Sequence, residues 1–172
     1  MNSFYPLLPM VLADGMELPT YAHDGDAALD LSVTEDIVLR PDEYRMVSSG
    51  VAVAIPRGFV GLVVPRSGWG RRGLVFKNTV GVIDSGYRGE IQLPLFNNNP
   101  THVWRHSTGP VFGTEMTELV PNMEGAIHVH KGDRVAQLLI VPIAQVQVLQ
   151  VDSLDDTERG TDGFGSSGYG RL

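Results

Sequence analysis

An acid and an aromatic ring lie three residues apart within residues 81–90, whose sequence is GVIDSGYRGE. Apolar residues precede Asp84, a Ser-Gly pair follows it, and Tyr87 comes next. This order is typical of a β-hairpin with a two-residue turn, which would hold the carboxylate and the ring over one pocket. A carboxylate so placed could do chemistry on a bound ligand. The alternative is that Asp84 only caps the turn and Tyr87 only covers the hairpin.

An arginine, a hydroxyl and a glycine come together in residues 65–73, PRSGWGRRG. Arg66, Ser67 and the close backbone approach that Gly68 permits are the parts of a phosphate-binding loop at the end of a strand. On its own, a tetrapeptide of this kind is also typical of an ordinary turn. The stretch therefore predicts a phosphate site only if other parts of the chain support it.

Two polar residues interrupt apolar strand patterns. Asp30 alternates with leucines in AALDL, so it would face away from the core, where a lone acid is often simply solvated. Gln137 lies in a strand that follows a tight turn, in KGDRVAQLLI. It must face outward or be hydrogen-bonded, because an unpaired buried amide costs roughly 1–3 kcal/mol.

The tail, residues 159–172, contains five glycines and two serines and cannot form a packed element. It could be a disordered terminus. Alternatively it is a mobile lid, in which Arg159, Ser166 and Ser167 close over a triphosphate and Phe164 stacks on a base.

Two pairs of histidines could bind a metal. His102 and His106 have helical i,i+4 spacing, and His128 and His130 alternate as on one face of a strand. No third ligand is evident for either pair, so the alternative is that all four are ordinary polar residues.

The elements that would position these residues are strands. Residues 37–64 are rich in valine and isoleucine and are punctuated by Gly, Pro and Asp, which predicts antiparallel strands and an all-β fold. The best helix candidate is short, at residues 67–72. Residues 97–126 are predicted to be an ordered excursion with a short helical piece at 115–119, and residues 141–151 are predicted to continue the last strand.

Length and composition limit the function. A chain of 172 residues is one domain by size, and it has no cysteine for a disulfide or a thiolate metal site. Its longest apolar runs are shorter than a membrane span, so we expect a soluble, cytoplasmic protein without a membrane partner. The net charge of −7 disfavours general nucleic-acid binding. Scattered arginines beside glycines suit a few phosphates better than a polymer.

Five stretches, taken in order, resemble the five motifs of the trimeric deoxyuridine triphosphate nucleotidohydrolases, the dUTPases. The resemblance extends over about residues 20–170, and the stretches are residues 27–31, 65–68, 81–90, 132–137 and 159–168. It implies a compact β-barrel or jelly-roll-like subunit. Residues 1–156 would form a single β-domain with an extended insertion at 97–130, and residues 157–172 would form the glycine-rich lid.

The resemblance implies a homotrimer with shared active sites, each completed by the tail of a neighbouring chain. Its reaction would be hydrolysis of dUTP to dUMP and pyrophosphate by water attack at the α-phosphorus, which limits uracil in DNA and supplies dUMP for thymidylate synthesis. By family role, Asp84 is the general base, and Asp30 supports Mg²⁺ through water. The Mg²⁺ would be held mainly by triphosphate oxygens, with no direct protein ligand.

The resemblance also assigns substrate-binding residues. Those that would bind phosphate are Arg66, Ser67, Gly68, Gln137, Arg159, Ser166 and Ser167. Those that would lie beside the base and sugar are Asn78, Val82, Ile83, Tyr87, Gln92, Phe164 and Gly165. Backbone groups of the hairpin can reject cytosine, because its hydrogen-bonding groups are reversed relative to those of uracil. Tyr87 would pack on deoxyribose, and Phe164 would stack on uracil.

The chain departs from the family pattern at several positions. Ala28 replaces a frequent glycine, Gly86 replaces a frequent aspartate, and the turn in 67–73 is one residue short, which leaves the roles of Arg71 and Arg72 open. The insertion at 97–130 lengthens the usual connection by about twenty residues, as in some phage-encoded members, and could bind a protein partner. In such a member the enzyme would act in the host cytoplasm.

Two other functions remain alternatives. The related dCTP deaminases share the fold and the Arg-Ser loop, but they carry a catalytic glutamate where this chain has Pro94. A nucleotide-dependent interaction protein could use the same scaffold and act through the insertion. Retention of Asp84, Tyr87 and the tail favours catalysis over the second alternative.

Overall fold

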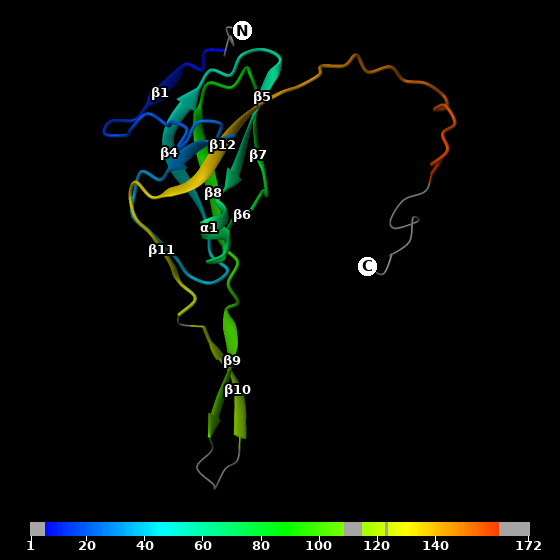
Figure 1. The fold of residues 1–172 in the computed structure, drawn as a ribbon. Coiled ribbons are helices and arrows are strands. Elements are labelled where there is room, and N and C mark those ends of the chain that lie inside the picture. Colours follow the sequence, from blue (N-terminus) through cyan, green and yellow to red (C-terminus); the bar gives the residue numbers. More distant parts are fainter. Residues whose placement is uncertain (1–5, 109–114, 123, 162–172) are drawn as a thin grey trace.

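Two four-stranded antiparallel sheets form the body of the molecule (Figure 1). The structure is a computed structural model that describes residues 6–108, 115–122 and 124–161, without the side chains of 104–108 and 115–118. The first sheet has the order β1 (Met10–Leu12), β4 (Tyr44–Val53), β8 (Glu90–Asn97) and β6 (Leu74–Phe76). The second has the order β2 (Leu29–Ser32), β12 (Arg134–Pro142), β5 (Phe59–Pro65) and β7 (Gly81–Ile83). A separate pair joins β3 (Ile37–Leu39) to β11 (Ile127–Val129).

The core lies between the sheets, because alternate residues of each sheet point inward. Leu29 and Leu31 of β2 and Leu138 of β12 are buried from one sheet, and Leu93 and Leu95 of β8 are buried from the other. Asp30 and Ser32 of β2 and Gln137 of β12 lie between these buried residues and face away from the core. The all-β, jelly-roll-like prediction is confirmed. Within the described residues the helical content is α1 (Ser67–Gly70), which confirms the short helix predicted at 67–72.

The segment around Asp84 is not the hairpin that its sequence predicts. β7 pairs with β5, whereas β8 pairs on one edge with β4 and on the other with β6. The two strands that flank Asp84 therefore belong to different sheets. The turn itself is as expected, since the Tyr87 N–H donates to the Asp84 carbonyl at 3.0 Å.

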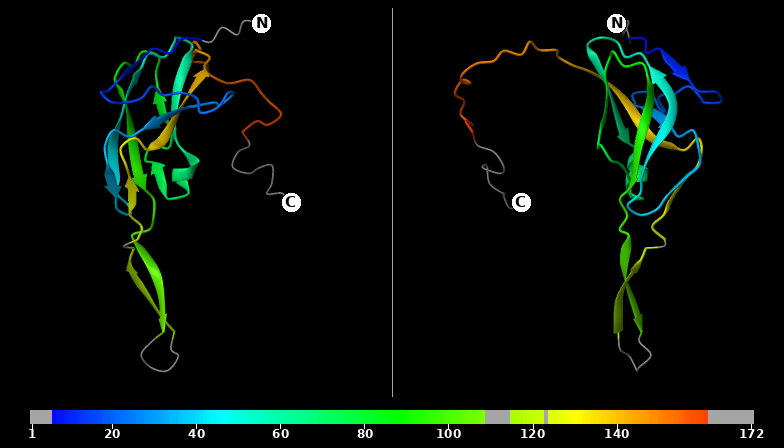
Figure 2. Two further views of the ribbon diagram at one scale, coloured as in Figure 1. Left: turned by 60° about the vertical axis from the view of Figure 1, so that its left-hand side comes forward. Right: turned by 180° about the vertical axis from the view of Figure 1, so that it is seen from behind.

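Within residues 97–130, where the insertion was predicted, a β-hairpin extends away from the body (Figure 2). β9 (His102–Thr108) and β10 (Glu115–Pro121) pair in register from His102 opposite Pro121 to Thr108 opposite Glu115. The predicted helical piece at 115–119 is therefore wrong, because these residues make a ladder with β9. His102 and His106 likewise lie in a strand and not in a helix.

β12 ends at Pro142, so the strand predicted to continue to residue 151 is also wrong beyond that point. Pro142 pairs with Phe59, the first residue of β5, and past it β12 has no neighbouring strand within the described chain. The following segment leaves the body (Figure 1), and its side chains Val146 and Val148 are 79% and 89% exposed. Over the residues that the structure describes, no helix has the length and apolar character needed to cross a membrane.

Candidate active site

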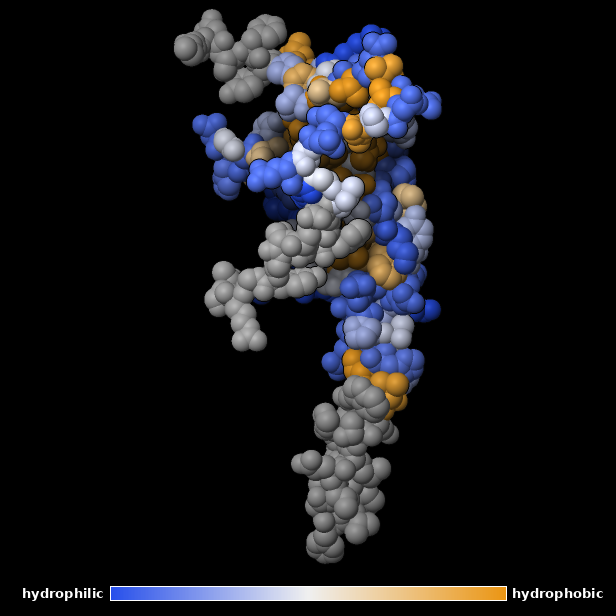
Figure 3. Space-filling view, turned by 90° about the vertical axis from the view of Figure 1, so that its right-hand side faces the viewer, coloured by the Kyte–Doolittle hydropathy of each residue, from blue (hydrophilic) through white to orange (hydrophobic). Residues whose placement is uncertain are grey.

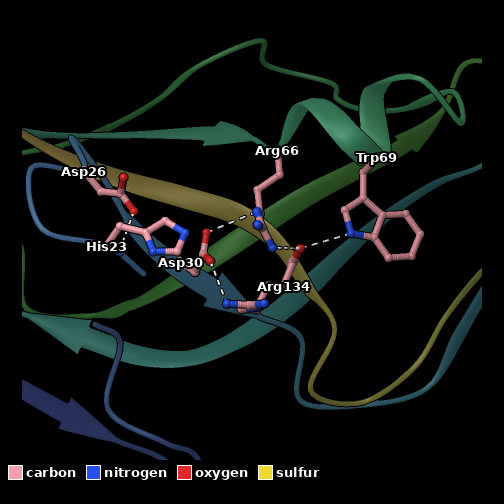
Figure 4. A network of polar contacts seen from close by, with 6 residues as sticks. All are labelled: His23, Asp26, Asp30, Arg66, Trp69 and Arg134. Atoms are coloured by element: carbon pink, nitrogen blue, oxygen red, sulfur yellow. Dashed lines mark hydrogen bonds and ion pairs between the residues drawn. The ribbon is translucent and has the colours of Figure 1, made fainter. Parts of the chain in front are cut away.

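Asp30 is held between two arginines on the outer face of β2 (Figure 4). Arg66 Nε lies 3.1 Å from Asp30 Oδ1, and Arg134 Nη1 lies 3.1 Å from Asp30 Oδ2. The Asp30 side chain is only 15% exposed. Asp30 is therefore not a solvated lone acid, but a carboxylate with a guanidinium on each oxygen.

The phosphate-loop residues lie beside this carboxylate because the strand register brings them there. Gln137 of β12 is the direct cross-strand partner of Asp30 and also pairs with Val64 of β5. Arg66 follows β5, and its N–H donates to the Val135 carbonyl at 2.9 Å. Ser67 then begins α1, and an added Cβ at Gly68 would meet no atom within 4 Å. The predicted residues of three separate motifs thus form one cluster.

A cavity of about 380 Å³ opens at this cluster. Its polar lining comes from His23, Asp26, Asp30, Arg66 and Gln137. Asp26 accepts a hydrogen bond from the backbone N–H of His23 at 2.8 Å, which fixes the loop before β2 (Figure 4). A guanidinium, an amide and backbone groups at an open cavity can bind the oxygens of an anion.

The cavity has fewer possible metal ligands than a metal centre held entirely by protein side chains would need. No group of three or more His, Cys, Asp or Glu residues able to hold a metal occurs among the described residues. Asp30 and Asp26 are the carboxylates that line the cavity. Two carboxylates suit Mg²⁺ that is bound mostly by water and by phosphate oxygens of a ligand, because Mg²⁺ retains several waters. His128 and His130 are exposed, and His130 Nδ1 lies 3.7 Å from Asp36 Oδ1.

Asp84 is exposed at the start of the turn between the sheets. The Arg88 guanidinium fixes this turn by donating to the carbonyls of Ser85 at 2.8 Å and Tyr87 at 2.7 Å. The Tyr87 hydroxyl donates to the Glu90 carbonyl at 3.0 Å, so the ring has a defined position while remaining 44% exposed. The carboxylate and the ring are thus presented to solvent on a rigid support.

The other residues expected at the base lie around this turn. Val82 of β7 is exposed, Ile83 is half-buried, and Asn78 is exposed in the preceding turn. Gln92 is exposed on β8, where its side chain donates to Glu90 Oε1 at 3.2 Å.

Within one chain, Asp84 and the Asp30 cluster lie far apart. The ladder puts Asp30, Gln137 and Val64 in one row, whereas Ile83 lies in the row of Gly61, three residues along β5. Asp84 is one residue farther still, which is roughly 13 Å along the strands, and three strand spacings add roughly 14 Å across the sheet. The structure therefore separates the predicted base from the predicted phosphate loop.

Of the tail residues assigned to the substrate, the structure describes Arg159. Arg159 lies in a turn and is exposed. Phe164, Gly165, Ser166 and Ser167 lie outside the described residues.

Sequence reasoning missed two residues of the cluster. Arg134 contacts Asp30 directly, and Trp69 donates from Nε1 to the Arg134 carbonyl at 3.0 Å. Trp69 is in turn stacked by Arg72, whose guanidinium carbon lies 4.3 Å from the ring centroid. The position of Arg134, three residues before Gln137 in the same motif, could have indicated a role at the site. Strand alternation, however, could not predict that its side chain faces Asp30.

Known proteins resemble this chain over nearly its whole length. The profile of the dUTPase family matches residues 14–105 and 116–168. The chain belongs to the dUTPase family. The interruption of the match, at residues 106–115, lies in the β9–β10 hairpin, so the rest of the dUTPase pattern continues on both sides of that hairpin.

Individual relatives agree with the dUTPase assignment. A deoxyuridine 5'-triphosphate nucleotidohydrolase of Nocardia farcinica is 41% identical over 169 residues, which are 98% of this chain and 88% of that protein. Its counterpart from Mycobacterium tuberculosis is 43% identical over 163 residues, with 91% of each chain covered. Among solved structures, Staphylococcus bacteriophage 80alpha dUTPase with dUPNHPP has a TM-score of 0.79 at 32% identity, covering 96% of this chain and 100% of that one.

Proposed function

We propose that this chain hydrolyses dUTP to dUMP and pyrophosphate by attack of water at the α-phosphorus. The observation that carries the proposal is that Asp30, Arg66 and Gln137, from three motifs of the dUTPase family, line one cavity. Asp84, from a fourth motif, is exposed on a turn fixed by hydrogen bonds. The reaction limits uracil in DNA and supplies dUMP for thymidylate synthesis.

Asp84 is the proposed general base, which orients the attacking water and accepts its proton. Arg66, Ser67, Gly68 and Gln137 bind phosphate oxygens and hold the triphosphate in line with that water. Phosphoryl transfer depends mainly on such positioning and on stabilising the charge that develops. A positioned base contributes about 10²–10⁴ in rate.

Mg²⁺ bound to the triphosphate would neutralise part of its negative charge. Asp30 would support the ion through its water shell, and Asp26 lies on the same cavity. This arrangement suits the small number of carboxylates in the cluster, because the substrate phosphates supply the remaining oxygen ligands.

The base and sugar are proposed to bind along β7. This strand is at the edge of its sheet, so its outer N–H and C=O groups are available to pair with a uracil edge. Asn78, Val82, Ile83 and Gln92 lie around this edge, and Tyr87 supplies a ring for the deoxyribose. Phe164 and Gly165 of the tail would cover the base, while Arg159, Ser166 and Ser167 would bind phosphate.

The active site is proposed to be shared between the chains of a homotrimer. A general base must reach its water by a hydrogen bond, so the separation of Asp84 from the Asp30 cluster is too large for one nucleotide to bridge within a single chain. A second copy of the chain can supply the missing half. The exposed valines and leucines after β12 also suit burial against a neighbouring chain. Separately, Figure 3 shows apolar residues gathered on the upper part of one face of the molecule.

The decisive measurement is pyrophosphate release from dUTP by the wild-type protein and the Asp84→Asn variant. We expect the variant to bind nucleotide but to turn over at least about a hundredfold more slowly, because it lacks the base. Ammonia release from dCTP, measured in parallel, would instead identify a deaminase. Equal pyrophosphate release by the variant and the wild type would contradict the role of Asp84.

A second, protein-binding role is proposed for the β9–β10 hairpin. It extends away from the body (Figure 2) and contains the residues that the dUTPase profile omits. Val103 and Leu119 are exposed near its base, so it offers apolar surface to a partner.

A further inference from the structure

Arg134 connects three parts of the phosphate cluster. Its side chain donates from Nη1 to Asp30 Oδ2 at 3.1 Å, and so binds β2. Its backbone carbonyl accepts from Trp69 Nε1 at 3.0 Å and from Arg66 Nη1 at 3.4 Å, and so binds α1 and the end of β5. One residue thus contacts both the carboxylate and the arginine of the proposed phosphate site (Figure 4).

A β-bulge sets the direction of this arginine. The ladder between β12 and β2 shifts register between Arg134 and Ala136, so Val135 is an extra residue. Val135 and Ala136 are consequently both buried, and Arg134 faces outward on the same side as Gln137. Without the bulge, strict alternation would turn the arginine into the core. Bulges next to active sites commonly redirect a side chain in this way.

On the proposed function, the two arginines on Asp30 have different tasks once a nucleotide binds. Arg66 must turn at least partly toward phosphate oxygens, which weakens its contact with Asp30. A carboxylate that is mostly buried is costly to leave without a counter-charge. Arg134 contacts the other carboxylate oxygen and can remain in place while Arg66 moves.

We infer that Arg134 is a positioning residue that stays paired with Asp30 and thereby releases Arg66 to bind the triphosphate. In its absence Asp30 would retain Arg66, and the triphosphate would have to compete with that ion pair. The inference rests on the proposed function, because the anion that recruits Arg66 is taken to be the triphosphate of dUTP.

The test is a double-mutant cycle on binding, without turnover. The affinity of an α,β-imido analogue of dUTP is measured by calorimetry in metal-free buffer for the wild type, R134Q, D30N and the D30N/R134Q double variant. We expect R134Q to weaken binding by roughly tenfold, as for loss of one charge-assisted hydrogen bond, and D30N and D30N/R134Q to bind equally. The last equality is expected because, without the carboxylate, nothing retains Arg66.

Control variants separate this role from a purely structural one. R45Q removes an equal charge from an exposed ion pair with Glu35 and should leave the affinity unchanged. R134K, which keeps the charge, should lose less affinity than R134Q, and it replaces R134Q in the cycle if R134Q does not fold. Equal affinity of R134Q and the wild type, or an equal loss in both Asp30 backgrounds, would overturn the inference. Failure of the wild type to bind the analogue both in this buffer and in the presence of Mg²⁺ would instead overturn the proposed function.

Discussion

Asn97 is a fully buried polar side chain that joins three segments of the chain. Its Nδ2 donates to the carbonyls of Leu39 at 2.9 Å and Gly125 at 2.8 Å, and its Oδ1 accepts from the Asn99 N–H at 3.0 Å. These bonds fix the point where the chain leaves β8 for the insertion and the point where it returns. A buried amide that satisfies two carbonyls is hard to replace, because each group left unpaired costs about 1–3 kcal/mol.

Asn97→Asp is expected to destabilise the fold by at least about 2 kcal/mol, because it places a carboxylate oxygen against two carbonyl oxygens. Asn98→Asp makes the same chemical change at the next, exposed residue and should alter stability by less than about 0.5 kcal/mol. Urea denaturation of the two variants and the wild type measures the difference. Equal stability of N97D and N98D would show that the Asn97 bonds contribute nothing.

At the scale of single elements, sequence patterns correctly predicted those strands and helices whose conformation depends on interactions within one short segment. The alternation of Leu29 and Leu31 around Asp30 correctly predicted a strand with its acid outward, and residues 67–72 correctly predicted a short helix. The strand state of β10 depends on pairing with β9, which its own sequence does not report. The pairing of β7 with β5 is similarly non-local.

The candidate site shows the same difference between features that depend on local sequence and features that depend on pairing with distant strands. The five-motif resemblance placed Asp30, Arg66 and Gln137 at one predicted site, and all three line the same cavity. Arg134 was not assigned a role, because its side chain faces Asp30 only through a bulge that strand alternation cannot predict. The sequence also could not predict the distance between Asp84 and the Asp30 cluster, because this distance depends on the register of four strands.

The β9–β10 hairpin is expected to be removable without loss of hydrolysis. His102 and Pro121 are directly opposite in its ladder, so replacing residues 103–120 by Asn-Gly closes the two strands with a two-residue turn. Asn122, which bonds to the carbonyls of Thr101 and Pro100, and the Asn97 contacts all remain.

The expected result for this deletion is a folded, assembled protein whose kcat/KM for dUTP lies within about threefold of the wild type, a change below about 1 kcal/mol. Size-exclusion chromatography and pyrophosphate release measure assembly and activity on the same sample. Complete loss of activity in a deletion variant that still assembles would mean that the hairpin is part of the catalytic unit.

At the scale of the whole molecule, the exposed segment after β12 requires an explanation. Val146, Val148, Leu149 and Leu154 are each at least 79% exposed, and the segment has no strand partner within the described chain. Exposed apolar side chains in a continuous stretch indicate a surface that another chain covers. Such a contact would carry the tail toward the active site of a neighbour, and would explain why Asp84 and the Asp30 cluster are far apart within one chain.

Complementation between two inactive chains tests whether the base and the tail of one site come from different chains. The first chain carries Asp84→Asn and keeps its tail, whereas the second ends at residue 156 and keeps Asp84. Each variant on its own, in the proposed homotrimer, should be inactive, because every site lacks either the base or the tail. In trimers assembled from equal amounts of both, random assortment gives about one quarter of the sites both an intact base and an intact tail, provided that these come from different subunits. We therefore expect co-expressed mixed trimers to recover about that fraction of wild-type turnover, whereas a site completed within one chain would recover none, since no chain in the mixture has both parts.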